Sequence, residues 1–149
     1  MPAVQDYVDV LVAPYFEAIA EWLETIETGV AGGVLDAIIR KRLGDPFFGI
    51  KLNPGHLIHL EEWMHSPIVP QGKVEMRSGM AVQLDVIPAT GSGYFTTNIE
   101  DGIALLDQYD RAVFAERYPK VMARIEARRQ FMDDALGIHL KPDVLPFSN

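Results

Sequence analysis

The chain of 149 residues contains no cysteine, few basic residues and no long apolar run. Without cysteine it can form neither disulfide bonds nor thiolate metal ligands, and a cytoplasmic location is the default expectation. Its apolar segments fall well short of the roughly 20 residues that span a bilayer. The N-terminus, MPAVQDYVDV, lacks the basic and apolar regions of a secretory signal. We therefore expect a cytoplasmic protein with no membrane partner.

Basic residues are outnumbered, since 13 lysines and arginines face 21 acidic residues and the net charge is −8. A protein that binds nucleic acid in general needs a basic surface to replace counterions, so nucleic acid is not an expected partner. The one basic cluster, Arg124 to Arg129, is interrupted by Glu126, and we interpret it as a solvated helix face. The hydrophobic fraction of 48% predicts a globular protein, with residues 1–149 as a single domain.

The first part of that domain, residues 1–46, has a helical pattern. Pro14 lies inside the first helix and predicts a kink or a shorter first turn. A second helix is expected over residues 34–43, ended by Gly44. The first helix is predicted from apolar side chains in steps of three and four between residues 5 and 27, at Val8, Leu11, Tyr15, Ile19, Trp22 and Ile26.

The second part, residues 47–107, is rich in strand patterns, and the third, residues 108–149, is helical with an extended tail. In the third part the helical pattern runs from 108 to 136, is broken near Pro119 and stops at Gly137. This order predicts an α+β fold in which helices pack on a small antiparallel sheet. The strand candidates in the second part are residues 47–52, 57–60, 80–87 and 95–106, with an irregular segment at 66–78.

Two of these strands bring carboxylates together. If the hairpin closes symmetrically around Ser92-Gly93, then Asp85 lies directly opposite Glu100. The same register also places apolar Leu84 opposite Asp101. Directly opposite side chains lie about 5 Å apart and point the same way. Two carboxylates in that position repel each other unless one takes a proton or a cation lies between them. The alternative is a solvated polar face whose charges are screened.

Three of the four histidines lie between Asn53 and Pro67. In an extended segment His56 and His59 point to opposite faces, so we do not expect them to bind one metal together. A single strand histidine is more often a hydrogen-bonded structural residue than a metal ligand. A histidine that joined the Asp85 and Glu100 pair would allow zinc, manganese, iron or cobalt as the ion.

The order of short motifs between residues 53 and 107 resembles the creatinase/aminopeptidase family of pita-bread metallopeptidases. That family includes methionine aminopeptidases, Xaa-Pro aminopeptidases and prolidases. The resemblance implies the later half of the pita-bread fold. The motifs that carry it are Gly55-His56, Leu60-Glu61-Glu62, Ser78-Gly79-Met80, the strand acid Asp85, and Ile99-Glu100-Asp101-Gly102.

The resemblance also implies a site. The family holds two metal ions with two aspartates, one histidine and two glutamates; by position His56 matches the histidine, Asp85 the first glutamate and Glu100 the second. The implied cofactor is a divalent metal (manganese, cobalt, zinc or iron) that activates water to attack a peptide bond. The alternative is a site without metal.

Three departures from the family pattern bear on activity. Asp85 stands where a glutamate is usual. Trp63 stands where a second histidine usually helps to bind substrate or move a proton, so His65 becomes the candidate catalytic substitute, with Trp63 and His59 as candidate substrate-binding residues. The two aspartate ligands belong on strands before the histidine, where this chain has helical patterns.

We therefore expect an Xaa-Pro peptidase-like domain, truncated and inactive as an isolated chain. If active, it would be a metal-dependent Xaa-Pro aminopeptidase or dipeptidase acting on a peptide substrate. The alternative is a non-catalytic peptidase-like binding module that self-associates. The family fold has pseudo-twofold symmetry, and one half on its own would leave apolar sheet surface uncovered. The expected partner is therefore a second copy or a complementary half-domain.

Overall fold

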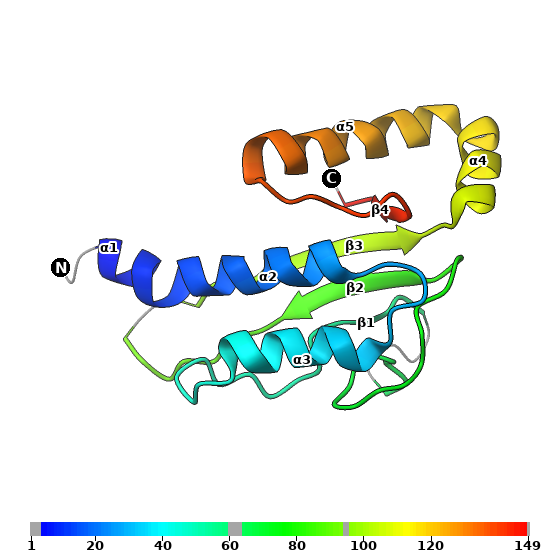
Figure 1. The fold of residues 1–149 in the computed structure, drawn as a ribbon. Helices are drawn as coiled ribbons and strands as arrows, with labels where there is room; N and C mark the ends of the chain where they lie inside the picture. The colour runs from blue at the N-terminus through cyan, green and yellow to red at the C-terminus, as the bar shows by residue number, and fades with distance from the viewer. Residues whose placement is uncertain (1–3, 60–63, 94–95, 149) are drawn as a thin grey trace.

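The computed structural model describes residues 4–59, 64–93 and 96–148. Its first layer is helical (Figure 1). Helix α1 (Val4–Tyr7), the π-helix η1 (Val8–Val12) and helix α2 (Ala13–Thr25) follow one another directly, and helix α3 (Gly32–Leu43) lies beside α2. Pro14 lies in the first turn of α2, directly after the π-helical segment, in which the Ala13 N–H bonds to the Val8 carbonyl group. The predicted first helix is thus confirmed, with a π-helical segment before the proline.

The second layer is a four-stranded antiparallel sheet in the order β1-β2-β3-β4. Its strands are β1 (His56–Leu57), β2 (Ala81–Val86), β3 (Ile99–Leu105) and β4 (Val144–Pro146). Helices α2 and α3 lie on the same side of this sheet (Figure 1). The α+β prediction is confirmed.

Two of the predicted strands differ from the structure. Residues 47–52 form a turn and an irregular segment, because the Asp45 carboxylate accepts a hydrogen bond from the Phe47 N–H at 2.8 Å and curls the chain. Of the predicted strand 57–60, only Leu57 lies in β1, which begins one residue earlier at His56. Residue 60 lies outside the described residues.

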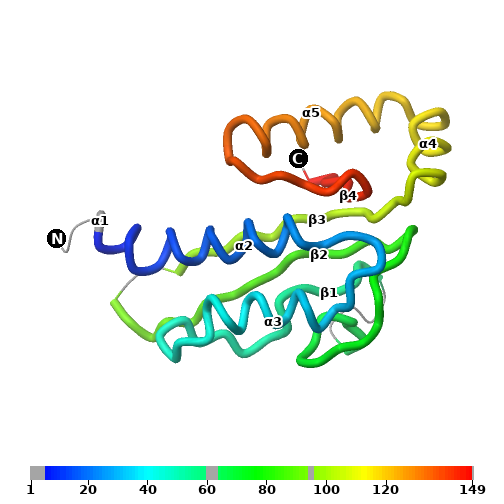
Figure 2. The backbone as a smooth tube through the Cα atoms, viewed as in Figure 1, coloured from blue at the N-terminus to red at the C-terminus, as the bar shows by residue number. Residues whose placement is uncertain are grey.

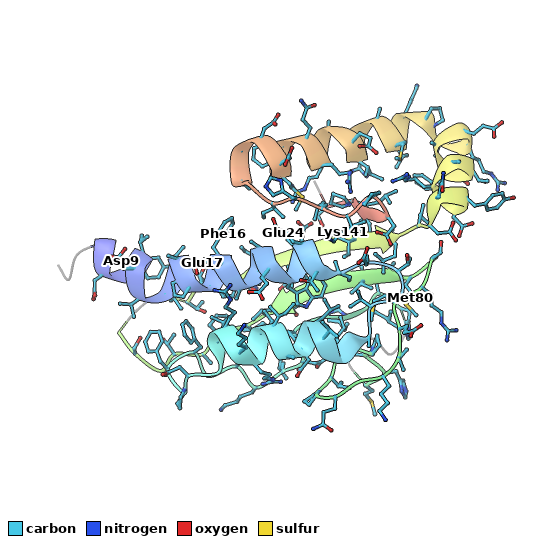
Figure 3. All side chains as sticks on the ribbon, viewed as in Figure 1. Asp9, Phe16, Glu17, Glu24, Met80 and Lys141 are labelled. Atoms are coloured by element: carbon cyan, nitrogen blue, oxygen red, sulfur yellow. The ribbon has the colours of Figure 1, made fainter. Side chains whose placement is uncertain are left out.

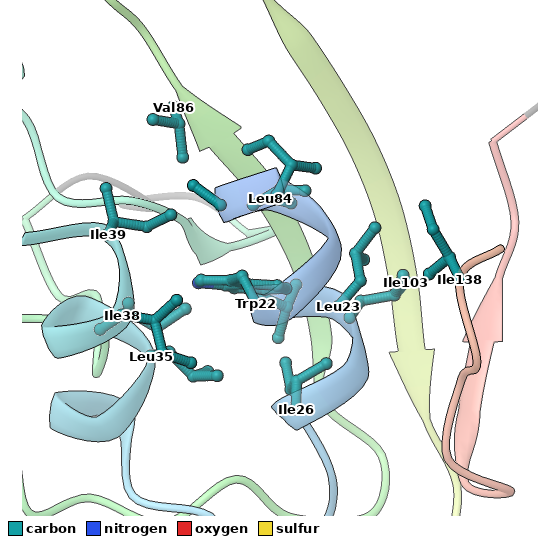
Figure 4. Packing of buried hydrophobic residues seen from close by; sticks show 14 of the residues in the cluster. Trp22, Leu23, Ile26, Leu35, Ile38, Ile39, Leu84, Val86, Ile103 and Ile138 are labelled. Atoms are coloured by element: carbon teal, nitrogen blue, oxygen red, sulfur yellow. The ribbon is translucent and has the colours of Figure 1, made fainter. Parts of the chain in front are cut away.

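The core lies between the helices and the sheet. Trp22 of α2 is completely buried and lies between α3 and strand β2, near Leu35, Ile38 and Leu84 (Figure 4). In β2 and β3 the residues that face this core are apolar apart from Asp101. They are Val82, Leu84, Val86, Ile99, Ile103 and Leu105. The apolar face of β2 and β3 is therefore covered, contrary to the expectation of an exposed apolar sheet surface.

The C-terminal third forms a helical hairpin and returns to the sheet. Helix α4 (Gln108–Arg117) is followed by α5 (Pro119–Leu136), which ends at Gly137 in the left-handed conformation (φ 67°), as the sequence predicted. The extended tail contains β4, which lies between β3 and α5 (Figure 2). The tail is also tied to α2, because Glu24 (labelled in Figure 3) accepts a hydrogen bond of 2.9 Å from the His139 N–H.

Two arginines of α5 point inward, which corrects the interpretation of residues 124–129 as a solvated face. Arg128 forms an ion pair of 2.9 Å with the buried Asp101, and this explains how an acid is accommodated opposite Leu84. Arg129 donates hydrogen bonds to the carbonyl groups of Leu140, Lys141 and Val144. Arg129 therefore occupies carbonyl groups on the outer edge of β4 and in the segment before it, and blocks pairing with another strand there. Burial lowers its pKa, and the nearby Arg111 adds to that effect while Glu126 and Asp143 oppose it.

We expect Arg129→Ala to lower the free energy of unfolding by about 1 kcal/mol, because carbonyl groups at the edge lose their donor and turn to water. Urea denaturation measures this loss. The exposed Arg124→Ala on the same helix is the matched control and should change the free energy of unfolding by less than about 0.5 kcal/mol. Equal losses in the two variants would contradict the role of Arg129 at the edge.

Candidate functional site

The two carboxylates meet as the hairpin register predicted. In the β2–β3 ladder Asp85 lies directly opposite Glu100, Val86 opposite Ile99, and Leu84 opposite Asp101. The backbone of Gly102 points its N–H and carbonyl group away from β2, toward Ser148 and Phe147. Glu100 lies two residues from Gly102 and shares its orientation, so Asp85 and Glu100 are a non-hydrogen-bonded pair, the type whose side chains lie closest.

His56 joins this face of the sheet from β1. It pairs with Gln83, the residue two positions before Asp85, and its Nε2 lies 3.9 Å from Oδ2 of Asp85. Its Nδ1 lies 3.0 Å from the carbonyl oxygen of Leu57. That oxygen can only accept a hydrogen bond, so Nδ1 carries the proton. In the neutral ring Nε2 then presents a lone pair on the side of Asp85.

Asp85 and Asp101 are both buried carboxylates with an unmatched Oδ1, but Asp101 is paired with Arg128. The exposed fraction of Asp85 is 4%, and its Oδ1 has no hydrogen-bond donor among the described residues. Burial raises the pKa of Asp85, the like charge of Glu100 raises it further, and His56 opposes the increase. A buried carboxylate with an unmatched oxygen is unfavourable unless a proton or a cation compensates it.

Glu100 faces solvent, and its carboxylate is held by two amides. Gln83 donates to it at 3.0 Å and Asn98 at 3.1 Å. These hydrogen bonds keep Glu100 beside Asp85. The two carboxylates differ in burial, because Asp85 is buried and Glu100 is exposed.

Tyr15 of α2 contacts the end of the same ladder from the other face of the sheet. Its hydroxyl accepts a hydrogen bond of 2.9 Å from the Ile99 N–H and donates one of 2.8 Å to the Val86 carbonyl group. Burial raises the pKa of Tyr15 to about 12, with added contributions from Asp85 and Glu100, so the hydroxyl remains a donor at all ordinary pH values. The sequence placed Tyr15 on an apolar helix stripe and gave no sign of this contact.

Phe147 is a second residue that sequence analysis missed. The Phe147 N–H donates to the Gly102 carbonyl group at 2.9 Å, and a Cβ on Gly102 would lie 2.6 Å from the Phe147 ring. Because Gly102 is on the same face as Gln83 and Glu100, the ring borders the candidate site. The only sequence signal was the glycine itself, which marks close approach of another group.

The other candidate residues lie in exposed segments or outside the described residues. His59 and His65 are both exposed, and His59 follows the end of β1, so their roles stay predictions. Trp63 lies outside the described residues. Among residues 4–59, 64–93 and 96–148 no three or more histidines and acids cluster closely enough to hold a metal ion. The three-ligand set of His56, Asp85 and Glu100 therefore remains a prediction.

These residues partly fit a divalent cation. The Nε2 lone pair of His56 and the unmatched Oδ1 of Asp85 are suitable donors, and the Nδ1 bond to a backbone carbonyl group is the usual outer contact of a histidine ligand. Glu100 would have to leave Gln83 or Asn98 to become the third ligand. A bound divalent cation would supply an activated water.

Comparison with known proteins gives a fold. Neither the protein-family models nor the curated proteins searched give a match. Several solved structures match well. A prolidase from Thermococcus sibiricus has a TM-score of 0.57 and 24% identity, over 69% of this chain and 28% of that chain. An X-Pro aminopeptidase from Thermotoga maritima has a TM-score of 0.57 and 22% identity, over 72% of this chain and 30% of that chain. An Xaa-Pro dipeptidase from Bacillus anthracis has a TM-score of 0.56 and 21% identity, over 74% of this chain and 30% of that chain.

The described chain thus has the pita-bread fold of the Xaa-Pro peptidases, as the sequence motifs implied. The chain spans less than a third of the length of each of these three proteins. Among the helices of the described residues, none has the length and apolar character needed to cross a bilayer.

Proposed function

We propose that this chain is an Xaa-Pro peptidase-like domain that binds a single divalent cation weakly and does not hydrolyse peptides by itself. The observation that carries the proposal is the buried pair of His56 and Asp85, with Glu100 directly opposite Asp85. This arrangement provides part of a metal site, whereas the family pattern needs two further aspartates. His56 and Asp85 would hold at most one cation, and Glu100 would become its third ligand only by leaving Gln83 or Asn98.

The cation site also accounts for the state of Asp85. A carboxylate that is buried, lacks a donor for Oδ1 and lies opposite a second carboxylate is costly to keep without a binding role. The exposed pair of His139, in the tail after α5, and Asp133 of α5 contains the same two residue types in solvent, where no such cost arises. The comparison separates a site built by burial from a simple surface contact.

The experiment is a titration of the purified chain with manganese and with cobalt, followed by an assay with Xaa-Pro dipeptides. We expect one cation per chain, no turnover, and at least a tenfold loss of affinity in His56→Ala and in Glu100→Ala. His139→Ala is the matched control and should leave the affinity unchanged. If the unaltered chain hydrolyses the dipeptides and both His56→Ala and Glu100→Ala abolish that activity, the proposed inactivity is wrong. If the unaltered chain binds no cation, the proposed metal site is wrong.

A second candidate is a non-catalytic peptidase-like module that self-associates or pairs with a complementary half-domain. The observation in its favour is that, within the described residues, α2 and α3 lie on the face of the sheet opposite to the one that bears His56, Gln83 and Glu100 (Figure 1). The β3 edge is not available for such pairing, because β4 occupies it. A monomer in sizing measurements at micromolar concentration would exclude self-association.

A further inference from the structure

The connection between β2 and β3 makes the end of their ladder vulnerable. A tight two-residue turn would hold the strands together, but here the chain leaves β2 at Val86 and returns only at Ile99. The next pair inward is Asp85 and Glu100, whose like charges push the strands apart. The least favourable pair therefore lies one step from the end of the ladder, and no tight turn closes that end.

The Tyr15 hydroxyl holds this end. It accepts from the Ile99 N–H and donates to the Val86 carbonyl group, so a single side chain links both strands at their last pair. Tyr15 is only 1% exposed, and it belongs to the buried stripe of α2 that includes Ile19 and Trp22. Its position is thus fixed by the core and does not depend on the connection between the strands.

We infer that Tyr15 is a positioning residue, whose hydroxyl fixes the spacing of Asp85 and Glu100 and so sets the affinity of the site for a divalent cation. It lies on the opposite face of the sheet from the proposed cation site and acts through the backbone of the adjacent pair. This inference rests on the proposed cation site for its functional consequence, but its structural part does not.

A second tyrosine provides a matched control. Tyr7, before the π-helix, donates a hydrogen bond of 3.2 Å to the Thr96 carbonyl group in the same connection. Tyr7→Phe therefore removes a tyrosine hydroxyl from the same helical segment without touching the ladder. Ile19→Val supplies a second control, because it lowers stability in the core without removing a polar contact.

The experiment compares Tyr15→Phe, Tyr7→Phe and Ile19→Val by amide hydrogen exchange and by cobalt titration, at a temperature where all remain folded. In Tyr15→Phe we expect exchange at Ile99 to accelerate by about tenfold or more, and cobalt affinity to fall by about tenfold. Both controls should keep the affinity of the unaltered protein. Affinity and Ile99 exchange that are both unchanged in Tyr15→Phe would overturn the inference.

The two proposals can fail separately. If the unaltered chain binds no cobalt but Ile99 exchange accelerates in Tyr15→Phe, the cation site is wrong and the link between the strands stands. If cobalt binds and Tyr15→Phe binds it equally well, the positioning role is wrong. Should Tyr15→Phe fail to fold, replacing Ile99 with its α-hydroxy analogue removes the N–H that donates to Tyr15. Cobalt titration then applies as before, and amide exchange is followed at Val86, the partner of Ile99 in the last pair.

Discussion

Replacing Trp22 with alanine is expected to lower the free energy of unfolding by about 4 kcal/mol, the largest loss that we anticipate for a single substitution. Trp22 is completely buried, and it contacts both layers of the fold between Leu35 of α3 and Leu84 of β2. Alanine would leave a cavity at the point where α2, α3 and the sheet meet. Because this loss is a large fraction of the stability of an ordinary domain, we expect partial unfolding at 37 °C. Urea denaturation followed by circular dichroism measures it.

Trp22→Phe separates packing from polarity at the same position. The Trp22 Nε1 is buried and has no acceptor among the described residues. Phenylalanine removes that unmatched donor and keeps most of the ring volume, so we expect it to lose less than half as much stability as alanine. A loss as large as that of Trp22→Ala would mean that the indole N–H has an essential partner, and would contradict this account.

The features of this fold that depend on residues close together in the sequence were the ones that could be predicted. The helix stripe from Leu11 to Trp22 and the stop at Gly137 depend on residues within a few positions, and they were correctly predicted. The pairing of Asp85 with Glu100 was also correctly predicted, because alternation and a symmetric closure fix an antiparallel register. The prediction of a strand over residues 47–52 was wrong, because the apolar residues there resemble a strand while the Asp45 side chain imposes a turn.

The parts that sequence analysis missed depend on contacts between distant segments. The burial of Arg128 and Arg129 follows from where α5 lies against β4, and a charged run on a helix contains no information about that position. The Tyr15 hydroxyl meets Ile99 only because α2 crosses the end of the ladder. In the candidate site, the residues that bear charge were found from their spacing, while the residues that hold and border them were not.

Replacing Asp85 with asparagine is expected to raise the free energy of unfolding at neutral pH by about 2 kcal/mol, although it removes a ligand from the candidate cation site. The carboxylate is buried, its Oδ1 has no donor among the described residues, and Glu100 lies opposite. Asparagine has nearly the same shape and carries no charge. If Asp85→Asn is more stable but binds no cation, then the native Asp85 lowers stability in order to bind, as residues at functional positions often do.

The pH dependence gives this prediction a second, independent test. The pKa of Asp85 is raised in the folded chain, first by burial and then by Glu100, above the ordinary value of 3.8 that holds in the unfolded chain. Between those two pKa values the folded state binds more protons than the unfolded state, so the stability of the unaltered chain falls as pH rises through that window. The penalty is absent below the unfolded pKa and complete above the folded pKa. Asp85→Asn lacks the penalty at every pH, so its advantage should vanish near pH 3 and grow to its full size toward neutrality.

The measurement is urea denaturation of both proteins from pH 3 to pH 8 without metal, with Asp134→Asn as the control. Asp134 is an exposed carboxylate on α5, so its substitution should shift the free energy of unfolding by less than about 0.5 kcal/mol at each pH. Adding cobalt should stabilise only the chain that retains Asp85, because a ligand that binds the folded state raises its apparent stability. An Asp85→Asn variant that is less stable than the unaltered chain at neutral pH without metal would mean that the carboxylate has a structural partner, and the argument for a cation site on this face would lose its main support.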